Sequence, residues 1–133
     1  MGGDNELLLG AVADVDAIAS RAIDDVLRIE RKYSRFRDDS VVAAINRAAG
    51  GAAVSIDAET AALLGYARTC FEQSGGRFDV TAGGLSALWD FARAPARRPP
   101  REALVAALAD VGFDAVAWSG RHVRILRRGM RID

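Results

Sequence analysis

Apolar positions in the first quarter of the chain recur at the spacing of an amphipathic helix. A short apolar run from Leu7 to Val12 comes first and predicts a buried strand. After it, apolar residues return every three or four positions, which predicts one long helix that ends near Tyr33. The positions that define this helix are Val15, Ile18, Ala19, Ala22, Ile23, Val26 and Leu27.

Three shorter helices are predicted by a polar residue or proline at one end and glycine at the other. A side-chain oxygen before a helix satisfies free N–H groups of its first turn, and glycine allows the chain to reverse at the end. Proline is favoured at the first helical position because its missing N–H is not needed there. The pairs are Asp39 or Ser40 with Gly50-Gly51, Asp57 with Gly75-Gly76, and Pro100 with Gly112.

After residue 112 the apolar pattern changes from helical spacing to alternation. Ser119-Gly120 can form a two-residue turn between the alternating segments, which predicts a β-hairpin. Residues 54–57 read as a short extended piece, and residues 130–133 as the start of another strand. The alternating apolar positions are Val116, Trp118, Val123 and Ile125. Four helices and these strands together predict an α+β fold, with residues 92–100, rich in proline, as an exposed loop.

Composition narrows the class of protein without identifying it. With 133 residues, half of them hydrophobic, the chain is expected to form one domain over residues 1–133. Eighteen basic and eighteen acidic side chains cancel, which argues against nucleic acid as a partner. The last predicted strand stops at Asp133, so we expect the chain to be part of a longer protein.

The cysteine content and the N-terminus bear on the compartment. Cys70 is the single cysteine, which excludes an internal disulfide and a multi-cysteine metal site and suits a reducing compartment. The apolar run near the N-terminus is too short for a signal peptide or a membrane span. These features predict a cytoplasmic protein, or a periplasmic or membrane-anchored one if a leader was removed.

The segment GGRFDVTAGG, residues 75–84, is the first candidate for chemistry. Glycine allows a ligand to approach the backbone closely. In an extended segment Asp79 and Thr81 would point to one face, with Phe78 and Val80 on the other, so a carboxylate and a hydroxyl could meet one polar ligand. The alternative is a structural role in which Asp79 caps a following helix.

The segment YSRFRDDS, residues 33–40, is the second candidate. Its aromatic rings could stack on a planar ligand, and Arg35 or Arg37 could meet a phosphate. The alternative is a solvated turn with Tyr33 packed inward. His122 lacks partners for a metal site and is interpreted as structural, and the arginines from 121 to 131 as the solvent side of the hairpin. The common nucleotide-binding and hydrolase motifs do not occur.

Taken in order, several blocks of the chain resemble the N-terminal half of the ApbE family. The blocks are MGG at the start, YSRFRDDSVVAAIN, VSIDAETAALLGYA, SGGRFDVTAGGLSALWDF, ALADVGFDAV and a final RID. Members of this family are FAD:protein FMN transferases, once called thiamine biosynthesis lipoproteins. The resemblance implies an ApbE-like α+β fold, with helices packed on a mainly antiparallel sheet that is incomplete within these 133 residues.

The resemblance also implies a reaction and a set of cofactor-binding residues. FAD would be the substrate, and FMN would move in an Mg²⁺-dependent step to a Thr or Ser hydroxyl of an acceptor flavoprotein. The resemblance places Met1 against the flavin and Phe36 at a stacking position that is usually tyrosine. It places Arg77, Phe78, Asp79 and Thr81 along the cofactor, with no catalytic residue among them.

Family members continue beyond the position of Asp133 into a glycine-rich segment and residues that hold Mg²⁺. The resemblance therefore implies that a C-terminal half or a second chain completes the fold and supplies the metal ligands. We accordingly expect the 133 residues alone to be inactive in FMN transfer. The alternatives are a non-catalytic flavin-binding or partner-binding module of the same family, and a structural protein that shares the fold alone.

Overall fold

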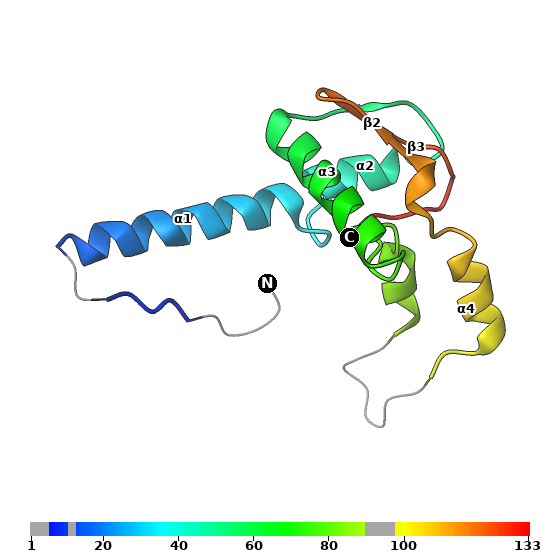
Figure 1. Ribbon diagram of the computed structural model, residues 1–133, viewed down its shortest axis with the longest axis horizontal. Helices are drawn as coiled ribbons and strands as arrows, with labels where there is room; N and C mark the ends of the chain where they lie inside the picture. The colour runs from blue at the N-terminus through cyan, green and yellow to red at the C-terminus, as the bar shows by residue number, and fades with distance from the viewer. Residues whose placement is uncertain (1–5, 11–12, 90–97) are drawn as a thin grey trace. The chain divides into compact units, whose positions relative to one another are not determined.

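Helices and a small antiparallel sheet make up the computed structural model of the chain, which describes residues 6–10, 13–89 and 98–133 (Figure 1). This arrangement confirms the predicted α+β fold class. Two compact units, Met1–Ala43 and Ala44–Asp133, are described separately here. The prediction of one domain over residues 1–133 stays a prediction.

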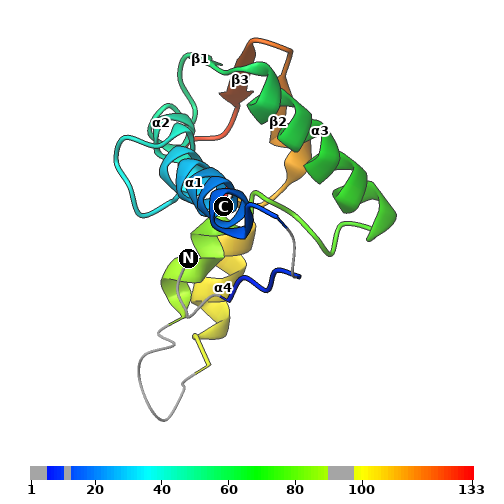
Figure 2. The same cartoon turned by 90° about the vertical axis from the view of Figure 1, so that its left-hand side faces the viewer.

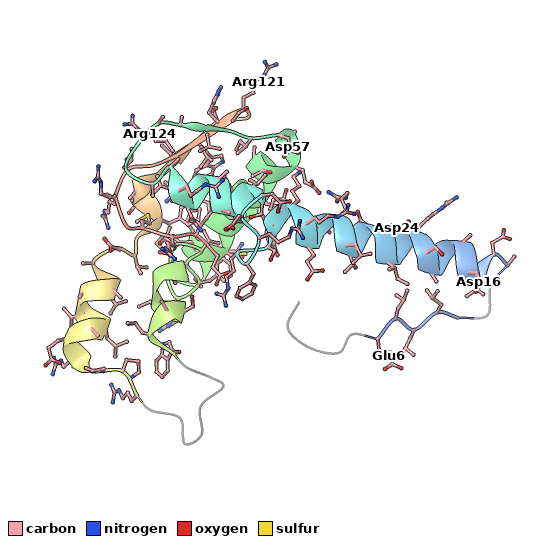
Figure 3. All side chains as sticks on the ribbon, turned by 180° about the vertical axis from the view of Figure 1, so that it is seen from behind. Glu6, Asp16, Asp24, Asp57, Arg121 and Arg124 are labelled. Atoms are coloured by element: carbon pink, nitrogen blue, oxygen red, sulfur yellow. The ribbon has the colours of Figure 1, made fainter. Side chains whose placement is uncertain are left out.

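The first unit is dominated by helix α1, Val15–Tyr33, as the apolar spacing predicted. The helix ends where the N–H of Ser34 donates to the carbonyl of Glu30 at 2.9 Å. Arg31 and Lys32 in the last turn favour this end, because cations interact well with the negative end of the helix dipole. Figure 3 shows Asp16 and Asp24 on the same helix, nearer its start.

The predicted strand from Leu7 to Val12 is wrong for the part that the structure describes. Residues 6–10 have no regular secondary structure, and the side chain of Leu8 is 82% exposed. A strand is stable only when its backbone pairs with a neighbour. Each of the three strands that the structure describes pairs within the second unit instead. Residues 11 and 12 lie outside the described residues.

The predicted ends of helices α2 and α3 are largely confirmed. Helix α2, Val41–Arg47, is capped by Ser40, whose Oγ accepts a hydrogen bond from the Ala43 N–H at 3.0 Å. Helix α3, Ala58–Gln73, is capped by Asp57, whose carboxylate accepts from the Thr60 N–H at 2.9 Å. At the end of α3 the N–H groups of Gly75 and Gly76 donate back to Glu72 and Phe71, a standard glycine stop.

The second unit contains the sheet, in which β3, His122–Ile125, lies between β1, Val54–Ser55, and β2, Val116–Trp118. Both pairings are antiparallel, and Trp118 lies opposite Val123. This confirms the predicted hairpin, although Ser119–Arg121 joins the strands rather than Ser119-Gly120 alone. The arginines from 121 to 131 are exposed as predicted, and Figure 3 shows Arg121 and Arg124 pointing away from the hairpin.

Helix α4, Arg101–Leu108, follows the proline-rich segment. Pro100 stands at the cap position rather than as the first helical residue, and Gly112, at φ +154°, follows the end of the helix. Residues 90–97, which include most of the predicted loop, lie outside the described residues. Two short 3₁₀ helices complete the unit, η1 at Gly83–Leu88 and η2 at Phe113–Ala115. In the described residues, no helix is both long and apolar enough to cross a membrane.

The core of the second unit centres on Phe113, which is 0% exposed. Its ring centroid lies 5.7 Å from that of Phe71 on α3 and 5.6 Å from that of Trp118 on β2. The Arg68 guanidinium lies over the same ring at 4.8 Å. These contacts hold α3 beside the hairpin, as Figures 1 and 2 both show. Cys70, which suits a core position by sequence, is half-buried.

The predicted strand at residues 130–133 is reduced to a single parallel bridge between Ala82 and Arg131. The next residue pairs with a side chain instead of a strand. The Ile132 N–H donates to Asn46 Oδ1 at 2.8 Å, and Asn46 Nδ2 donates to the Ile132 carbonyl at 3.0 Å. The side chain of Asn46 thus takes the place of a neighbouring strand in pairing with the backbone of Ile132. It fixes the C-terminal segment beneath the candidate site, residues 77–83, which is described below.

Candidate functional site

The candidate site is the site turn, residues Arg77–Gly83, which begins where α3 ends. Gly75 and Gly76 have φ of +62° and +78°, a left-handed conformation that reverses the chain direction. The Ser74 hydroxyl then accepts a hydrogen bond from the Phe78 N–H at 2.9 Å and donates to the Phe71 carbonyl at 3.1 Å. The chain therefore enters the site turn in a defined direction.

The backbone at Asp79 and Thr81 is a turn, and the predicted extended segment is wrong. The Ala82 N–H donates to the Asp79 carbonyl at 3.1 Å, which closes a four-residue turn. Asp79 Oδ1 accepts two hydrogen bonds from Thr81, at 2.8 Å from the backbone N–H and at 2.7 Å from the hydroxyl. A short polar side chain that satisfies nearby backbone groups favours a turn over a strand.

The site turn is supported by two distant segments. The Gly112 N–H, between α4 and η2, donates to Thr81 Oγ1 at 2.8 Å. On the other side the Asp133 N–H donates to the Val80 carbonyl, and the Gly83 N–H to the Arg131 carbonyl. A Cβ at Gly83 would lie 2.9 Å from the Arg131 oxygen, so only glycine fits. The site turn is thus held in place by the segment before η2 and by the C-terminal residues.

Three side chains of the site turn remain available to a ligand. Arg77 is exposed, and within the described residues its guanidinium has no hydrogen bond or ion pair. Phe78 is 48% exposed. Every buried side-chain nitrogen or oxygen in the described part of the chain has a partner, so Asp79 Oδ2, which has none there, is open to solvent. A cation, an aromatic face and a hydrogen-bond acceptor therefore stand on adjacent residues.

Thr81 differs from the other three predicted residues of the site turn. It is 1% exposed, and its hydroxyl is used within the protein as both donor and acceptor. The predicted direct contact of Thr81 with a ligand does not fit this geometry. The alternative role, in which Asp79 caps the following helix, is only partly confirmed. The Asp79 carboxylate accepts from the Thr81 N–H in the turn before η1, whereas the cap position of η1 is Ala82.

The second predicted segment, around Phe36, belongs to the first unit. Phe36 is 84% exposed, and the Arg35 guanidinium lies 4.7 Å from its ring centroid. Arg37 donates to Asp39 through Nε at 2.9 Å and through Nη2 at 2.8 Å. This bidentate hydrogen bonding lowers the pKa of the Asp39 carboxyl below its ordinary value. Arg37 is therefore already paired, while Phe36 offers an open aromatic face.

The structure brings together only part of the predicted site. Arg77, Phe78 and Asp79 share one turn with the inward-facing Thr81. Met1 lies outside the described residues, and Phe36 belongs to the other unit, so their predicted position beside the site turn stays a prediction. Ser74, Asn46 and Gly112 also shape the turn, and sequence reasoning missed these roles. Gly112 was recognised only as a helix stop.

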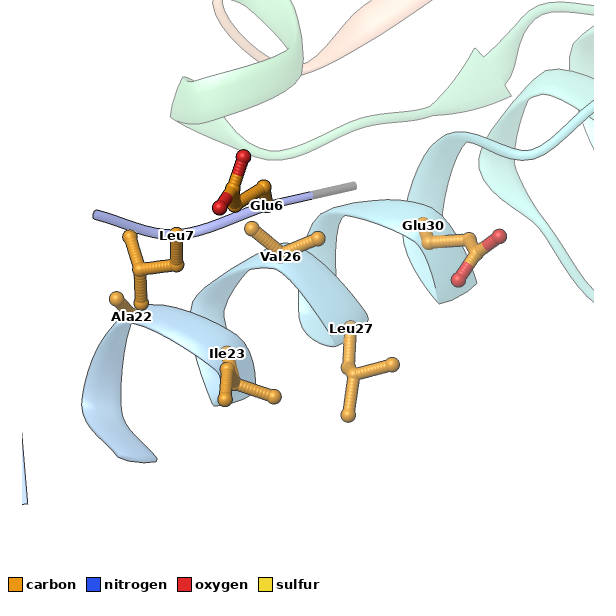
Figure 4. A pocket seen from close by; sticks show the side chains of 7 residues that line it. All are labelled: Glu6, Leu7, Ala22, Ile23, Val26, Leu27 and Glu30. Atoms are coloured by element: carbon orange, nitrogen blue, oxygen red, sulfur yellow. The ribbon is translucent and has the colours of Figure 1, made fainter. Parts of the chain in front are cut away.

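A groove of about 560 Å³ lies in the first unit, between residues 6–7 and α1 (Figure 4). Its walls are mostly apolar and include two carboxylates. The lining residues are Glu6, Leu7, Ala22, Ile23, Val26, Leu27 and Glu30. None of the predicted site residues that the structure describes lines it. In the described residues, no three acidic, histidine or cysteine side chains are grouped so that they could hold a metal ion.

Comparison with known proteins places these features in a family. The sequence profile described as the ApbE family matches residues 1–133. A protein from Treponema pallidum named FAD:protein FMN transferase is 31% identical over 146 aligned residues, which cover 96% of this chain and 40% of that protein. A protein of the same name from Chlamydia pneumoniae is 23% identical over 80% of this chain and 34% of its own length.

Solved structures agree with the fold. The ApbE protein of Thermotoga maritima is 32% identical and superposes with a TM-score of 0.79, over 90% of this chain and 40% of its own. The flavinyl transferase ApbE of Pseudomonas stutzeri, in its apo form, is 21% identical with a TM-score of 0.78. The chain thus has the ApbE fold but spans only about two fifths of the relatives it matches.

Proposed function

The chain belongs to the ApbE family, and we propose that it forms the flavin-contacting part of an FAD:protein FMN transferase. The observation that carries the proposal is the 31% identity to the transferase of Treponema pallidum, which extends over 96% of this chain. The site turn supports it, because its exposed Arg77 and Phe78 suit an anionic, aromatic ligand. It lies within the residues that the family profile matches.

In the proposed reaction, the acceptor is a Thr or Ser side chain of a target flavoprotein. Its hydroxyl oxygen attacks the phosphorus on the FMN side of FAD, and a phosphoester bond forms there. The bond from that phosphorus to the bridging oxygen of the pyrophosphate breaks, AMP leaves with the electron pair, and the hydroxyl proton passes to a base. Bound Mg²⁺ would neutralise charge that develops on the phosphates.

The role proposed for this chain is to bind and orient FAD. The guanidinium of Arg77, which has no partner among the described residues, suits a phosphate, which it can contact with two parallel hydrogen bonds. The faces of Phe78 and Phe36 suit the flat isoalloxazine ring. Asp79 Oδ2 accepts a hydrogen bond from a donor on the ligand. Met1 is proposed as a further flavin contact, on the resemblance alone.

We assign no residue of this chain to Mg²⁺. A magnesium site takes oxygen ligands, usually including one or two carboxylates. The described residues contain no group of three candidate ligands. On the family resemblance alone, we place the metal ligands in the part of the family members that this chain does not span.

The 133-residue chain alone is expected to bind FAD but to leave an acceptor peptide unmodified. Orientation of FAD without the metal ligands would lack the charge stabilisation on which phosphoryl transfer depends. Incubation with FAD, Mg²⁺ and a Thr-containing acceptor peptide, followed by mass spectrometry, tests this. A full-length family member serves as the positive control. Covalent FMN on the peptide with the 133-residue chain would overturn the expectation of inactivity.

A non-catalytic flavin-binding or partner-binding module is the second candidate. The observation that favours it is that the exposed groups of the site turn, Arg77, Phe78 and Asp79, suit contact with a ligand, while none of them is assigned to catalysis. The two candidates separate when the chain is mixed with the remaining part of a family member. Restored transfer of FMN to the peptide supports the transferase, and flavin binding without transfer supports the module.

Replacing Phe36 with alanine is expected to weaken FAD binding by roughly fivefold while leaving the melting temperature unchanged. The expected loss follows from the modest value of an aromatic stacking contact, about 0.5–1.5 kcal/mol. Stability should hold because Phe36 is exposed and fills no core space. The measurement is a fluorescence titration with FAD. Tyr66→Ala removes another exposed aromatic, from α3, and serves as the control. An unchanged affinity in Phe36→Ala contradicts the proposed stacking role.

A further inference from the structure

We propose that Thr81 is a positioning residue, which fixes the Asp79 carboxylate so that Oδ2 faces the ligand. This inference rests on the proposed function, because it assumes that the site turn contacts FAD. It differs from the prediction made from sequence, in which Thr81 itself met the cofactor. The proposed role is indirect and acts through Asp79.

The hydrogen bonds of Thr81 leave its hydroxyl no freedom. A hydroxyl has one proton to donate, and Thr81 donates it to Asp79 Oδ1 at 2.7 Å. The Thr81 N–H donates to the same oxygen at 2.8 Å. Two donors on one carboxylate oxygen hold the plane of the group, because rotation would break both bonds. Oδ2 is then presented as an acceptor in one orientation.

The position of the Thr81 hydroxyl is itself set from a distant segment. The Gly112 N–H donates to Thr81 Oγ1 at 2.8 Å, and so the oxygen is anchored as well as its proton. The Arg127 guanidinium donates to the carbonyls of Ala109 and Val111, at 3.3 and 3.4 Å, which steadies the segment that carries Gly112. This series of hydrogen bonds, from Gly112 through Thr81 to Asp79, therefore links the segment between α4 and η2 to the exposed Oδ2 of Asp79.

The exposed Oδ2 of Asp79 limits which groups of a ligand can bind there. A carboxylate oxygen accepts hydrogen bonds and cannot donate them, so Oδ2 selects an N–H or O–H donor and disfavours phosphate. The neighbouring Arg77 has the opposite preference. On FAD, donors occur on the ring system, the sugar hydroxyls and the adenine amine, whereas the pyrophosphate offers acceptors. The site turn thus offers Asp79 to the hydrogen-bond donors of the ligand and Arg77 to its phosphates.

The same pair of contacts occurs elsewhere in the chain and supplies a matched control. At the start of α3, Asp57 Oδ1 accepts from the Thr60 N–H at 2.9 Å and from the Thr60 hydroxyl at 2.7 Å. Thr60 is also buried. Loss of its hydroxyl should destabilise the fold through the same chemistry as loss of the Thr81 hydroxyl, but outside the site turn.

The first test compares FAD affinity in Thr81→Val, Thr81→Ser and Thr60→Val, measured well below each melting temperature. Thr81→Val is expected to weaken FAD binding by roughly fivefold, the loss that one modest hydrogen bond implies. Thr81→Ser keeps the hydroxyl and should stay within about twofold of the parent chain. Thr60→Val should bind FAD normally. Equal affinity in Thr81→Val and the parent chain, or equal losses in both valine variants, overturns the inference.

Asp79→Asn tests the inference without changing Thr81, and serves if Thr81→Val does not fold. The amide oxygen can still accept both bonds from Thr81, but the group that replaces Oδ2 becomes a donor. We expect a melting temperature close to that of the parent chain and FAD affinity at least roughly tenfold weaker. Full affinity in this variant overturns the inference.

A readout without flavin separates this inference from the proposed function. Amide hydrogen exchange at Gly112 should quicken in Thr81→Val and stay slow in Thr81→Ser, because Thr81 Oγ1 accepts the Gly112 N–H. Unchanged exchange at Gly112 overturns the inference even if FAD binds. If the parent chain fails to bind FAD, the proposed function and the role of Thr81 towards the ligand fall together. Normal FAD binding in Thr81→Val rejects the role of Thr81 alone.

Discussion

Replacement of Phe113 by alanine is expected to lower the free energy of unfolding by about 3–5 kcal/mol. The ring is fully buried, and it contacts Phe71 on α3 and Trp118 on β2. The guanidinium of Arg68 also lies over it. Removal leaves a cavity where helix and sheet meet, and the surrounding side chains cannot fill it by collapse alone. Such a loss is a large share of the roughly 5–15 kcal/mol that stabilises a typical domain.

Urea denaturation followed by circular dichroism measures the loss. Phe113→Leu should fall between the parent chain and Phe113→Ala, since it keeps part of the apolar volume. Val105→Ala, at an exposed position of α4, should change the free energy of unfolding by less than about 1 kcal/mol. A loss of that small size for Phe113→Ala would show that Phe113 is not the centre of the core.

Replacement of Asp79 by alanine is expected to weaken FAD binding by roughly tenfold to a hundredfold. A hydrogen bond to a charged group is worth about 1.5–3 kcal/mol, and that range converts to these factors. The change removes Oδ2, the acceptor that faces solvent, and also the partner of both Thr81 donors. Affinity and stability should therefore fall together.

Asp57→Ala separates the two effects of the Asp79 change. It removes the same pair of bonds, to the Thr60 N–H and hydroxyl, at the start of α3. Both alanine variants should lose a cap, a loss of about 1 kcal/mol in typical helices. Only Asp79→Ala should lose FAD affinity in a titration of folded protein. Comparable affinity in the two variants would remove Asp79 from the flavin site.

Local signals in the sequence predicted the helices well. The caps at Ser40 and Asp57, and the stop at Gly75-Gly76, depend on bonds between residues no more than five positions apart. Such bonds form whenever the local residues are right, and so pattern and capping rules identify them. The hairpin was predicted for the same reason, because alternation and a short turn are local features.

Two of the wrong predictions, both of strands, concern segments whose structure depends on a distant partner. Residues 6–10 have the composition of a strand but no neighbour to pair with among the described strands. Residues 130–133 also have the apolar pattern of a strand, but the backbone N–H and carbonyl of Ile132 bond to the side chain of Asn46, 86 positions earlier in the chain. A strand pattern states which side chains suit a sheet and does not state whether a partner is available.

For the site, the sequence determined which residues stand in the turn, and the ordered blocks determined the family. The direction of each side chain came from tertiary structure. Thr81 is buried, and its hydroxyl finds a partner in the Gly112 N–H, 31 positions later; Asp79 presents one oxygen because Thr81 occupies the other. Alternation along a strand would have shown both side chains to the ligand. A hydrogen bond between distant segments decided otherwise, because a buried hydroxyl requires a partner wherever the fold provides one.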